Sequence, residues 1–127
     1  MKKYLDLTPR QLQALQDLPE EKTLQMLNLL KFKDHVSETN KTGKSQYQEY
    51  MVAAGPFIQK SRGKVIYYGT AQLSLIGPEH LEWDQVLIVE YPSKREFLEM
   101  VTTPGYPAKL RKLALEDSRL IFCGTDE

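Results

Sequence analysis

A single amide interrupts an apolar run near the beginning of the chain. Asn28 stands in the middle of MLNLL, residues 26–30, and burying an amide without a hydrogen-bond partner costs about 1–3 kcal/mol. A second apolar run, residues 86–91, carries one carboxylate, Glu90. Both runs are typical of central strands that are apolar on both faces. Each polar group therefore marks a buried network or the wall of a ligand pocket.

Four tyrosines offer further hydroxyl groups. Tyr47 and Tyr50 fall on an expected helix, and Tyr67 and Tyr68 on an expected strand. A phenol can bind a ligand or donate a proton, and it is equally common in a core with its hydroxyl at the surface. The sequence leaves both interpretations open.

The histidines and the cysteine give little indication of a metal site or a catalytic site. His80, Glu82 and Asp84 alternate, so an extended segment would place them on one side, where they could hold a divalent metal or orient a base. Charges in a loop before a strand are more often only solvated. With two histidines and one cysteine at no ligand spacing, we expect no metal, no haem and no other cofactor.

Two nucleotide-binding interpretations fail. Gly43-Lys44-Ser45 suggests a phosphate loop, but that motif needs a glycine five residues before Gly43, where Glu38 stands. An RNA-recognition sheet needs stacking aromatics in its third strand, which here is Val-Leu-Ile-Val. Basic and acidic residues balance at 17 each, so no net field attracts nucleic acid or an anionic membrane. We expect neither partner.

Length and composition indicate one small cytoplasmic domain. A chain of 127 residues suits a single domain. Its apolar runs are far shorter than the roughly 20 residues that span a bilayer, and no signal-peptide core follows Met1. Cys123 is the only cysteine, which excludes an internal disulfide and fits a reducing compartment. We expect it to be a small apolar residue of a late strand, not a nucleophile.

The periodicity predicts an α+β order of elements. A short helix follows the cap Thr8-Pro9, and residues 1–22 form an N-terminal helical extension to a domain of residues 23–127. That domain reads strand, helix, strand, strand, helix, strand, which is the ferredoxin-like βαββαβ pattern with a four-stranded antiparallel sheet. The expected elements are strand 24–32, a helix from residue 47 to Gly63 kinked at Pro56, strands 65–76 and 83–91, a helix opened by a Ser93/Glu96 capping box, helix 108–116 and strand 119–123.

The first and third strands are apolar on both faces, whereas helices can cover only one. We therefore expect a homodimer in which two sheets stack face to face as a dimeric α/β barrel. Alternatively, the N-terminal helix folds over the open face.

Several segments together resemble the domain of unknown function 1330 family, within the dimeric α/β-barrel superfamily. They are MLNLLKF (26–32), LIGP (75–78), Trp83-Asp84, VEYPS (89–93), Tyr106, Arg111 and LEDSRLI (115–121). The resemblance spans nearly the whole chain from Thr8. It implies the fold and a homodimer but no settled activity, since the superfamily includes cofactor-free oxygenases, isomerases, haem-binding enzymes and binding modules.

The resemblance also implies a set of site residues. The family-like polar residues could line a pocket between sheet and helices, with Arg111 holding a ligand carboxylate and Asn28 a carbonyl or enolate oxygen. In the alternative, Arg111 pairs with Asp117 or Glu90 and Asn28 bonds to neighbouring backbone, which would make the set purely structural. With the tyrosines added, the candidate ligand-binding residues are Asn28, Tyr50, Tyr67, Trp83, Glu90, Tyr106, Arg111 and Asp117.

Two functions follow from these residues. The first is a protein that binds a small anionic or aromatic metabolite, as a cofactor-free oxygenase or isomerase with Glu90, Asp117 or a tyrosine as acid or base. The second is a non-catalytic dimeric binding or structural module. They differ in whether Asn28, Trp83 and Arg111 converge on an open cavity or close onto one another.

Overall fold

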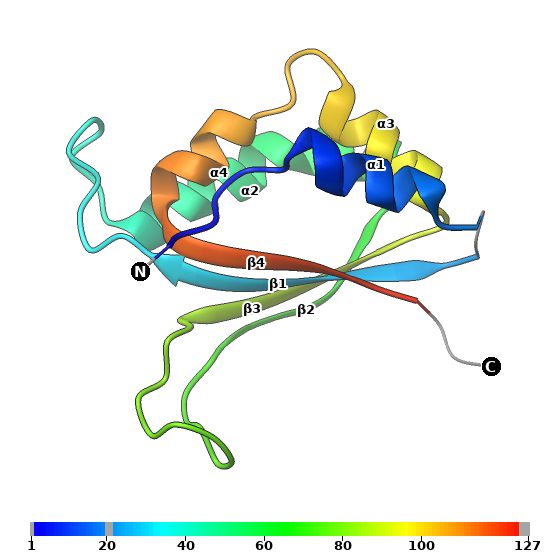
Figure 1. Ribbon diagram of the computed structural model, residues 1–127. Helices are drawn as coiled ribbons and strands as arrows, with labels where there is room; N and C mark the ends of the chain where they lie inside the picture. The colour runs from blue at the N-terminus through cyan, green and yellow to red at the C-terminus, as the bar shows by residue number, and fades with distance from the viewer. Residues whose placement is uncertain (1, 20–21, 125–127) are drawn as a thin grey trace.

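The computed structural model describes residues 2–19 and 22–124, and its helices all lie on one side of the sheet (Figure 1). In chain order the elements are α1 Pro9–Asp17, β1 Leu24–Phe32, α2 Gly43–Lys60, β2 Lys64–Thr70, β3 Gln85–Tyr91, α3 Lys94–Thr102, α4 Ala108–Ala114 and β4 Leu115–Cys123. Helix α2 continues through Pro56. None of the helices described is long and apolar enough to cross a membrane.

The strands form one antiparallel sheet in the order β2-β3-β1-β4. Strand β1 is central, and Asn28 lies opposite Leu87 of β3 and Leu120 of β4. This is the βαββαβ arrangement with crossing helices on one face, so the ferredoxin-like α+β fold predicted from the sequence is confirmed.

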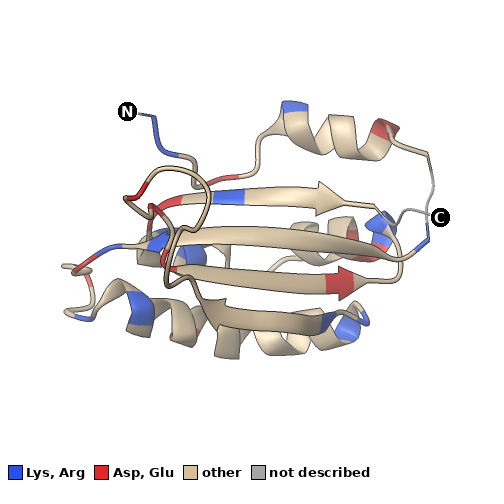
Figure 2. Cartoon of the chain, turned by 90° about the horizontal axis from the view of Figure 1, so that it is seen from below, with Lys and Arg blue, Asp and Glu red and all other residues tan. Residues whose placement is uncertain are grey.

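The two faces of the sheet differ in burial. Along β1 and β3, buried residues alternate with half-buried ones. Asn28 and Leu87 point toward the helices, while Leu27, Leu29 and Ile88 point to the open face. From below, the strands carry few charged residues, and these lie mostly near the strand ends (Figure 2).

Several predicted boundaries are wrong: the helix expected from residue 47 begins at Gly43, and the strands expected from residues 83 and 119 begin at Gln85 and Leu115. Two differences have a clear physical reason. The strand expected over 65–76 ends at Thr70, and residues 71–84 form a long loop, because Leu73, Leu75 and Ile76 have the strand pattern but no strand to pair with. The helix expected over 108–116 ends at Ala114, and β4 begins at the next residue. Leu115 is fully buried and pairs with Phe32, so sheet pairing overrides the helical pattern there.

The start of α2 is fixed by a close backbone approach. The Gly43 amide donates to the carbonyl oxygen of Lys33 at 2.9 Å, and the Lys33 amide donates to that of Ala114 at 3.0 Å. A Cβ at Gly43 would lie 2.3 Å from the Lys33 oxygen and 2.7 Å from the Ala114 oxygen, so only glycine fits. This contact joins the end of β1 to the beginning of α2 and the end of α4, and it explains Gly43 without a phosphate loop.

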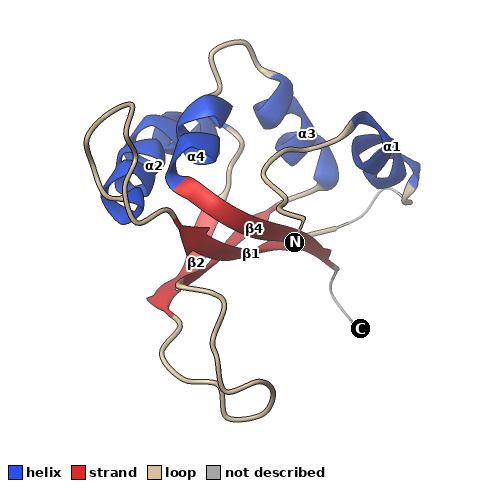
Figure 3. Ribbon diagram, turned by 60° about the vertical axis from the view of Figure 1, so that its left-hand side comes forward, coloured by secondary structure: helices blue, strands red, loops and turns tan. Residues whose placement is uncertain are grey.

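Helix α1 lies beside α3 on the helix side (Figure 3), so the alternative in which it covers the open face does not occur. Thr8 accepts the Gln11 amide at 3.2 Å as the expected N-cap. The buried Lys94 ammonium holds the other end of α1 by donating to the carbonyl oxygens of Gln16 at 2.7 Å, of Leu15 at 3.3 Å and of Leu18. In the predicted capping box of α3, Ser93 donates to the Glu96 carboxylate but caps no backbone amide.

Candidate functional site

A cavity of about 820 Å³ lies between the helix-covered face of the sheet and the four helices. Its floor comes from β1, β3 and β4, and its walls from the four helices and the segment before α1. The lining includes Leu12, Leu15, Met26, Asn28, Tyr50, Val89, Phe97, Met100, Tyr106, Arg111, Leu120 and Phe122. Its volume falls in the upper part of the roughly 300–1,000 Å³ range of pockets for small molecules.

Arg111 and Asn28 meet in this cavity. Arg111 reaches from α4 toward the centre of β1, where its Nη2 donates to Asn28 Oδ1 at 3.2 Å. The Asn28 amide nitrogen donates to the carbonyl oxygens of Leu87 at 3.3 Å and Met26 at 3.4 Å. The backbone carbonyl groups thus satisfy the NH2 group of Asn28, and its carbonyl oxygen positions the Arg111 guanidinium. The guanidinium retains further N–H donors that could bind a ligand.

Phenols surround the guanidinium. The hydroxyls of Tyr50 and Tyr106 lie 2.5 Å apart. Burial raises the pKa of Tyr47, Tyr50 and Tyr106, and the charge of nearby Arg111 lowers each pKa by a smaller amount. The Tyr47 hydroxyl is buried and falls short of hydrogen-bond geometry to any described group, although Arg111 is close enough to affect it. All three phenols stay neutral hydrogen-bond donors near pH 7.

The carboxylates proposed as rivals for Arg111 lie elsewhere. Asp117 Oδ1 accepts from the Tyr4 backbone amide and from Arg119 Nη1, each at 2.9 Å. Burial raises the pKa of Asp117, but these hydrogen bonds outweigh it and leave the pKa below its ordinary value. Glu90 lies in register with Gln25 on the open face and accepts from its side chain at 3.4 Å. Among the described residues, no carboxylate pairs with Arg111.

The structure thus brings half of the candidate site residues together: Asn28, Tyr50, Tyr106 and Arg111 line the cavity. Tyr67 is half-exposed on β2 and aligned with Ile88 of the open face. Trp83 lies before β3, where the Arg119 guanidinium sits 5.1 Å from its ring and 4.8 Å from that of Tyr4. Trp83 therefore helps to hold the N-terminal segment against β4, outside the cavity.

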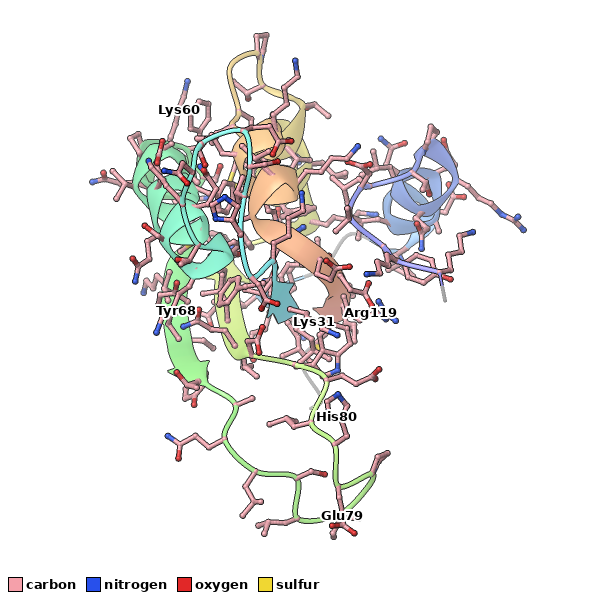
Figure 4. All side chains as sticks on the ribbon, turned by 90° about the vertical axis from the view of Figure 1, so that its left-hand side faces the viewer. Lys31, Lys60, Tyr68, Glu79, His80 and Arg119 are labelled. Atoms are coloured by element: carbon pink, nitrogen blue, oxygen red, sulfur yellow. The ribbon has the colours of Figure 1, made fainter. Side chains whose placement is uncertain are left out.

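The His80, Glu82 and Asp84 pattern does not form a cluster. His80 and Glu79 lie on the loop that extends below the sheet, on the side away from the helices (Figure 4). Asp84 Oδ2 accepts the Phe32 amide at 2.8 Å and so fixes the end of β1. In the part of the chain described, no three His, Cys, Asp or Glu side chains are grouped as metal ligands.

Sequence reasoning missed the apolar end of the cavity. Leu12 and Leu15 of α1 line it, as do Phe97 and Met100 of α3. Their helical spacing was visible in the sequence, but spacing alone cannot separate a core stripe from a cavity wall. Lys94 was missed as well, because a lysine at the start of a helix is ordinarily solvated.

The chain is similar to solved structures over nearly its whole length. Two crystal structures of the RPA0582 protein of Rhodopseudomonas palustris, described as of unknown function, superpose over nearly the whole chain. The methylated form is 35% identical, with a TM-score of 0.90 and coverage of 100% of this chain and 98% of that one. The other is 33% identical, with a TM-score of 0.89 and 99% coverage of both chains. The chain belongs to the RPA0582 family.

More distant structures share the fold of the RPA0582 family. A dabb family protein with a ferredoxin-like fold from Mesorhizobium loti is 16% identical (TM-score 0.52; 84% of this chain, 100% of that one). SnoaB, a cofactor-independent oxygenase from Streptomyces nogalater, is 13% identical (TM-score 0.53; 84% and 96%). A dimeric protein of unknown function from Bacteroides fragilis is 15% identical (TM-score 0.54; 84% and 100%). No family model and no curated protein matches the chain.

Proposed function

We propose that this protein binds a small organic anion in the cavity between sheet and helices, with Arg111 as the anchor. The observation that carries the proposal is a guanidinium that faces a cavity of about 820 Å³ and whose side-chain partners among the described residues, the Asn28 amide and the nearby Tyr47 hydroxyl, are both neutral. A half-buried guanidinium that lacks an anionic partner is poorly stabilised, and its N–H groups match a carboxylate.

The neutral phenols complete an anion site. One hydroxyl of the Tyr50–Tyr106 pair donates to the other, which leaves the second proton free for a ligand oxygen. Phenols with raised pKa values do not compete with the ligand as negative charges. Binding is favoured over proton abstraction, because the carboxylates suggested as bases, Glu90 and Asp117, do not line the cavity. For a cofactor-free oxygenase or isomerase, the available group is a phenol that donates a proton.

We further propose that the protein is a homodimer. The open face carries Leu27, Leu29, Val86, Ile88 and Ile121, and no described helix covers it. A second copy stacked on this face would bury it, as the sheets of a dimeric α/β barrel do. The structural neighbour from Bacteroides fragilis is described as dimeric, which supports this proposal. A non-catalytic dimeric module remains the alternative to an enzyme.

Three finer hypotheses accompany this proposal. They are a division of the chain into an extension of residues 1–22 and a domain of residues 23–127, membership in the domain of unknown function 1330 family, and a cytoplasmic location. The resemblance in residues 26–32 and 115–121 supports the second of them.

Thermal melting with matched ligands tests the proposal. Benzoate should raise the melting temperature of the wild type, and benzamide, which has the same ring without the charge, should not. Arg111→Gln should abolish the benzoate shift and lower the unfolding free energy by no more than about 1–3 kcal/mol, because the Asn28 oxygen loses a donor but no carboxylate loses its partner. Lys109→Gln removes a charge from the exposed side of the same helix and should keep the shift. A large loss of stability in Arg111→Gln, without any carboxylate effect on the wild type, would favour a structural role.

A further inference from the structure

We infer that the ligand is a monocarboxylic acid with a large apolar body, a long alkyl chain or a fused ring system, that extends from Arg111 toward α1 and α3. This inference rests on the proposed function and names its ligand class. It follows from three properties of the cavity: its anion-binding groups gather at one end, Arg111 is its one lining cation without a carboxylate partner among the described residues, and its volume far exceeds that of an anionic headgroup.

The polar groups lie at the α2 and α4 end. Arg111 comes from α4 and Tyr50 from α2, with Tyr106 just before α4. Arg111 contacts Asn28 in the middle of β1, and the hydroxyls of Tyr50 and Tyr106 lie 2.5 Å apart. The headgroup therefore has a defined place.

The rest of the lining, toward α1 and α3, is mainly apolar, with Gln11 and Tyr91 among its polar side chains. Met26 is the next residue of β1 on the same face, about 6.6 Å along the strand from Asn28. Around and beyond it lie Val89 and Phe122 on the sheet and Phe97, Met100 and Val101 on α3. This wall offers contact to carbon and few hydrogen bonds, so the body of the ligand has to be apolar.

The cavity has a place for one negative charge. The other ionic side chains of its lining, Asp6 and Arg119, are paired with Lys112 and Asp117, each at 2.9 Å. A second carboxylate at the apolar end would meet no cation among the described residues and would lose its hydration. Dicarboxylates should therefore bind less well than monocarboxylates of equal length.

Helix α1 gives the apolar end its outer wall. Leu12 and Leu15 face the cavity, although α1 contains no fully buried residue. Lys94 fixes the C-terminal end of the helix, and Ser118 Oγ donates to the Tyr4 carbonyl oxygen at 2.6 Å to hold the segment before it. An apolar ligand body would bury the two leucine side chains more completely.

Titration calorimetry with a series of acids tests the inference. Dodecanoate should bind at least roughly tenfold more tightly than octanoate, because each buried methylene adds affinity, and acetate should not bind measurably. Dodecanol lacks the anion and dodecanedioate adds a second one, so both should bind more weakly than dodecanoate. 1-Pyrenebutyrate tests the same chemistry with a fused-ring body, and its affinity relative to dodecanoate separates a ring from a chain.

Two variants test which end of the cavity binds the carboxylate and which end binds the apolar body of the ligand. Arg111→Gln should weaken dodecanoate and benzoate alike. Leu12→Gln, on a half-buried position of α1, should weaken dodecanoate about tenfold and leave benzoate within twofold of the wild type. If benzoate binds through Arg111 but affinity does not rise with chain or ring size, or dodecanedioate equals dodecanoate, this inference is wrong and the proposed function stands. If no carboxylate binds, both are wrong.

Discussion

The two faces of the sheet come from the same strands and have opposite requirements. On the covered face, β1 presents Asn28 to the cavity, where backbone carbonyl groups and a guanidinium satisfy its hydrogen bonds. On the open face, the neighbouring Leu27 and Leu29 have no such partners and remain half-buried. The polar group at the centre of β1 is thus placed where the chain covers it, while the middle of the open face offers apolar surface that a second molecule can bury.

The largest expected effect comes from placing a charge on the open face. Leu29→Asp should shift the protein from dimer to monomer, because a buried unpaired carboxylate costs about 3–5 kcal/mol, or roughly 100-fold or more in the dissociation constant. Sedimentation velocity at micromolar concentration measures the shift. Val52→Asp introduces the same charge at an exposed position of α2 and should leave the dimer intact. A wild type that sediments as a monomer would remove the proposed role of the open face.

A smaller effect is expected on the covered face at the attachment of α1. Lys94→Met should free the carbonyl oxygens of Leu15, Gln16 and Leu18 and cost about 1.5–3 kcal/mol of local stability, the value of a hydrogen bond to a charged group. Hydrogen exchange should therefore accelerate in α1 and not in β1. Equal acceleration throughout the chain would show instead that α1 unfolds only with the whole domain.

The smallest expected effect concerns the buried phenols. Burial raises the pKa of Tyr50, so the folded state keeps this proton at a pH where the unfolded chain loses it. Its contribution to stability is complete below about pH 10 and falls as the pH rises further, by up to about 1.4 kcal/mol per pH unit. Tyr50→Phe should flatten that alkaline slope in denaturant titrations. Phenolate absorbance of Tyr50 that appears without unfolding would contradict its burial.

The sequence predicted the fold well, because strand and helix periodicities reflect which face is buried. It predicted β1 over residues 24–32 and the order of the elements. It failed at residues 71–76, where the strand pattern lacks a neighbour, and at Leu115, where pairing with Phe32 ends the preceding helix. Local pattern cannot report either of these long-range facts.

The candidate site was predicted only in part, because local pattern shows which residues are unusual but not where the fold places them. Asn28 and Arg111 stood out because each is polar in an apolar pattern, and the structure brings them together. Glu90 and Asp117 stood out equally, but a one-residue difference in strand phase turns a side chain to the other face. Nothing in the sequence marked Lys94 as buried, because its partners are backbone carbonyl groups of α1, which is far away in sequence.

The junction of α4 and β4 connects the covered face of the sheet directly to an edge strand of the open face. Arg111 lies on α4, which ends at Ala114, and β4 begins at Leu115 without a connecting loop. A ligand that pulls on the guanidinium therefore acts on an edge strand whose Ile121 belongs to the open face. In the homodimer proposed above, occupancy of the cavity would therefore be coupled to the affinity between copies, and by reciprocity assembly would change how tightly each copy retains the ligand.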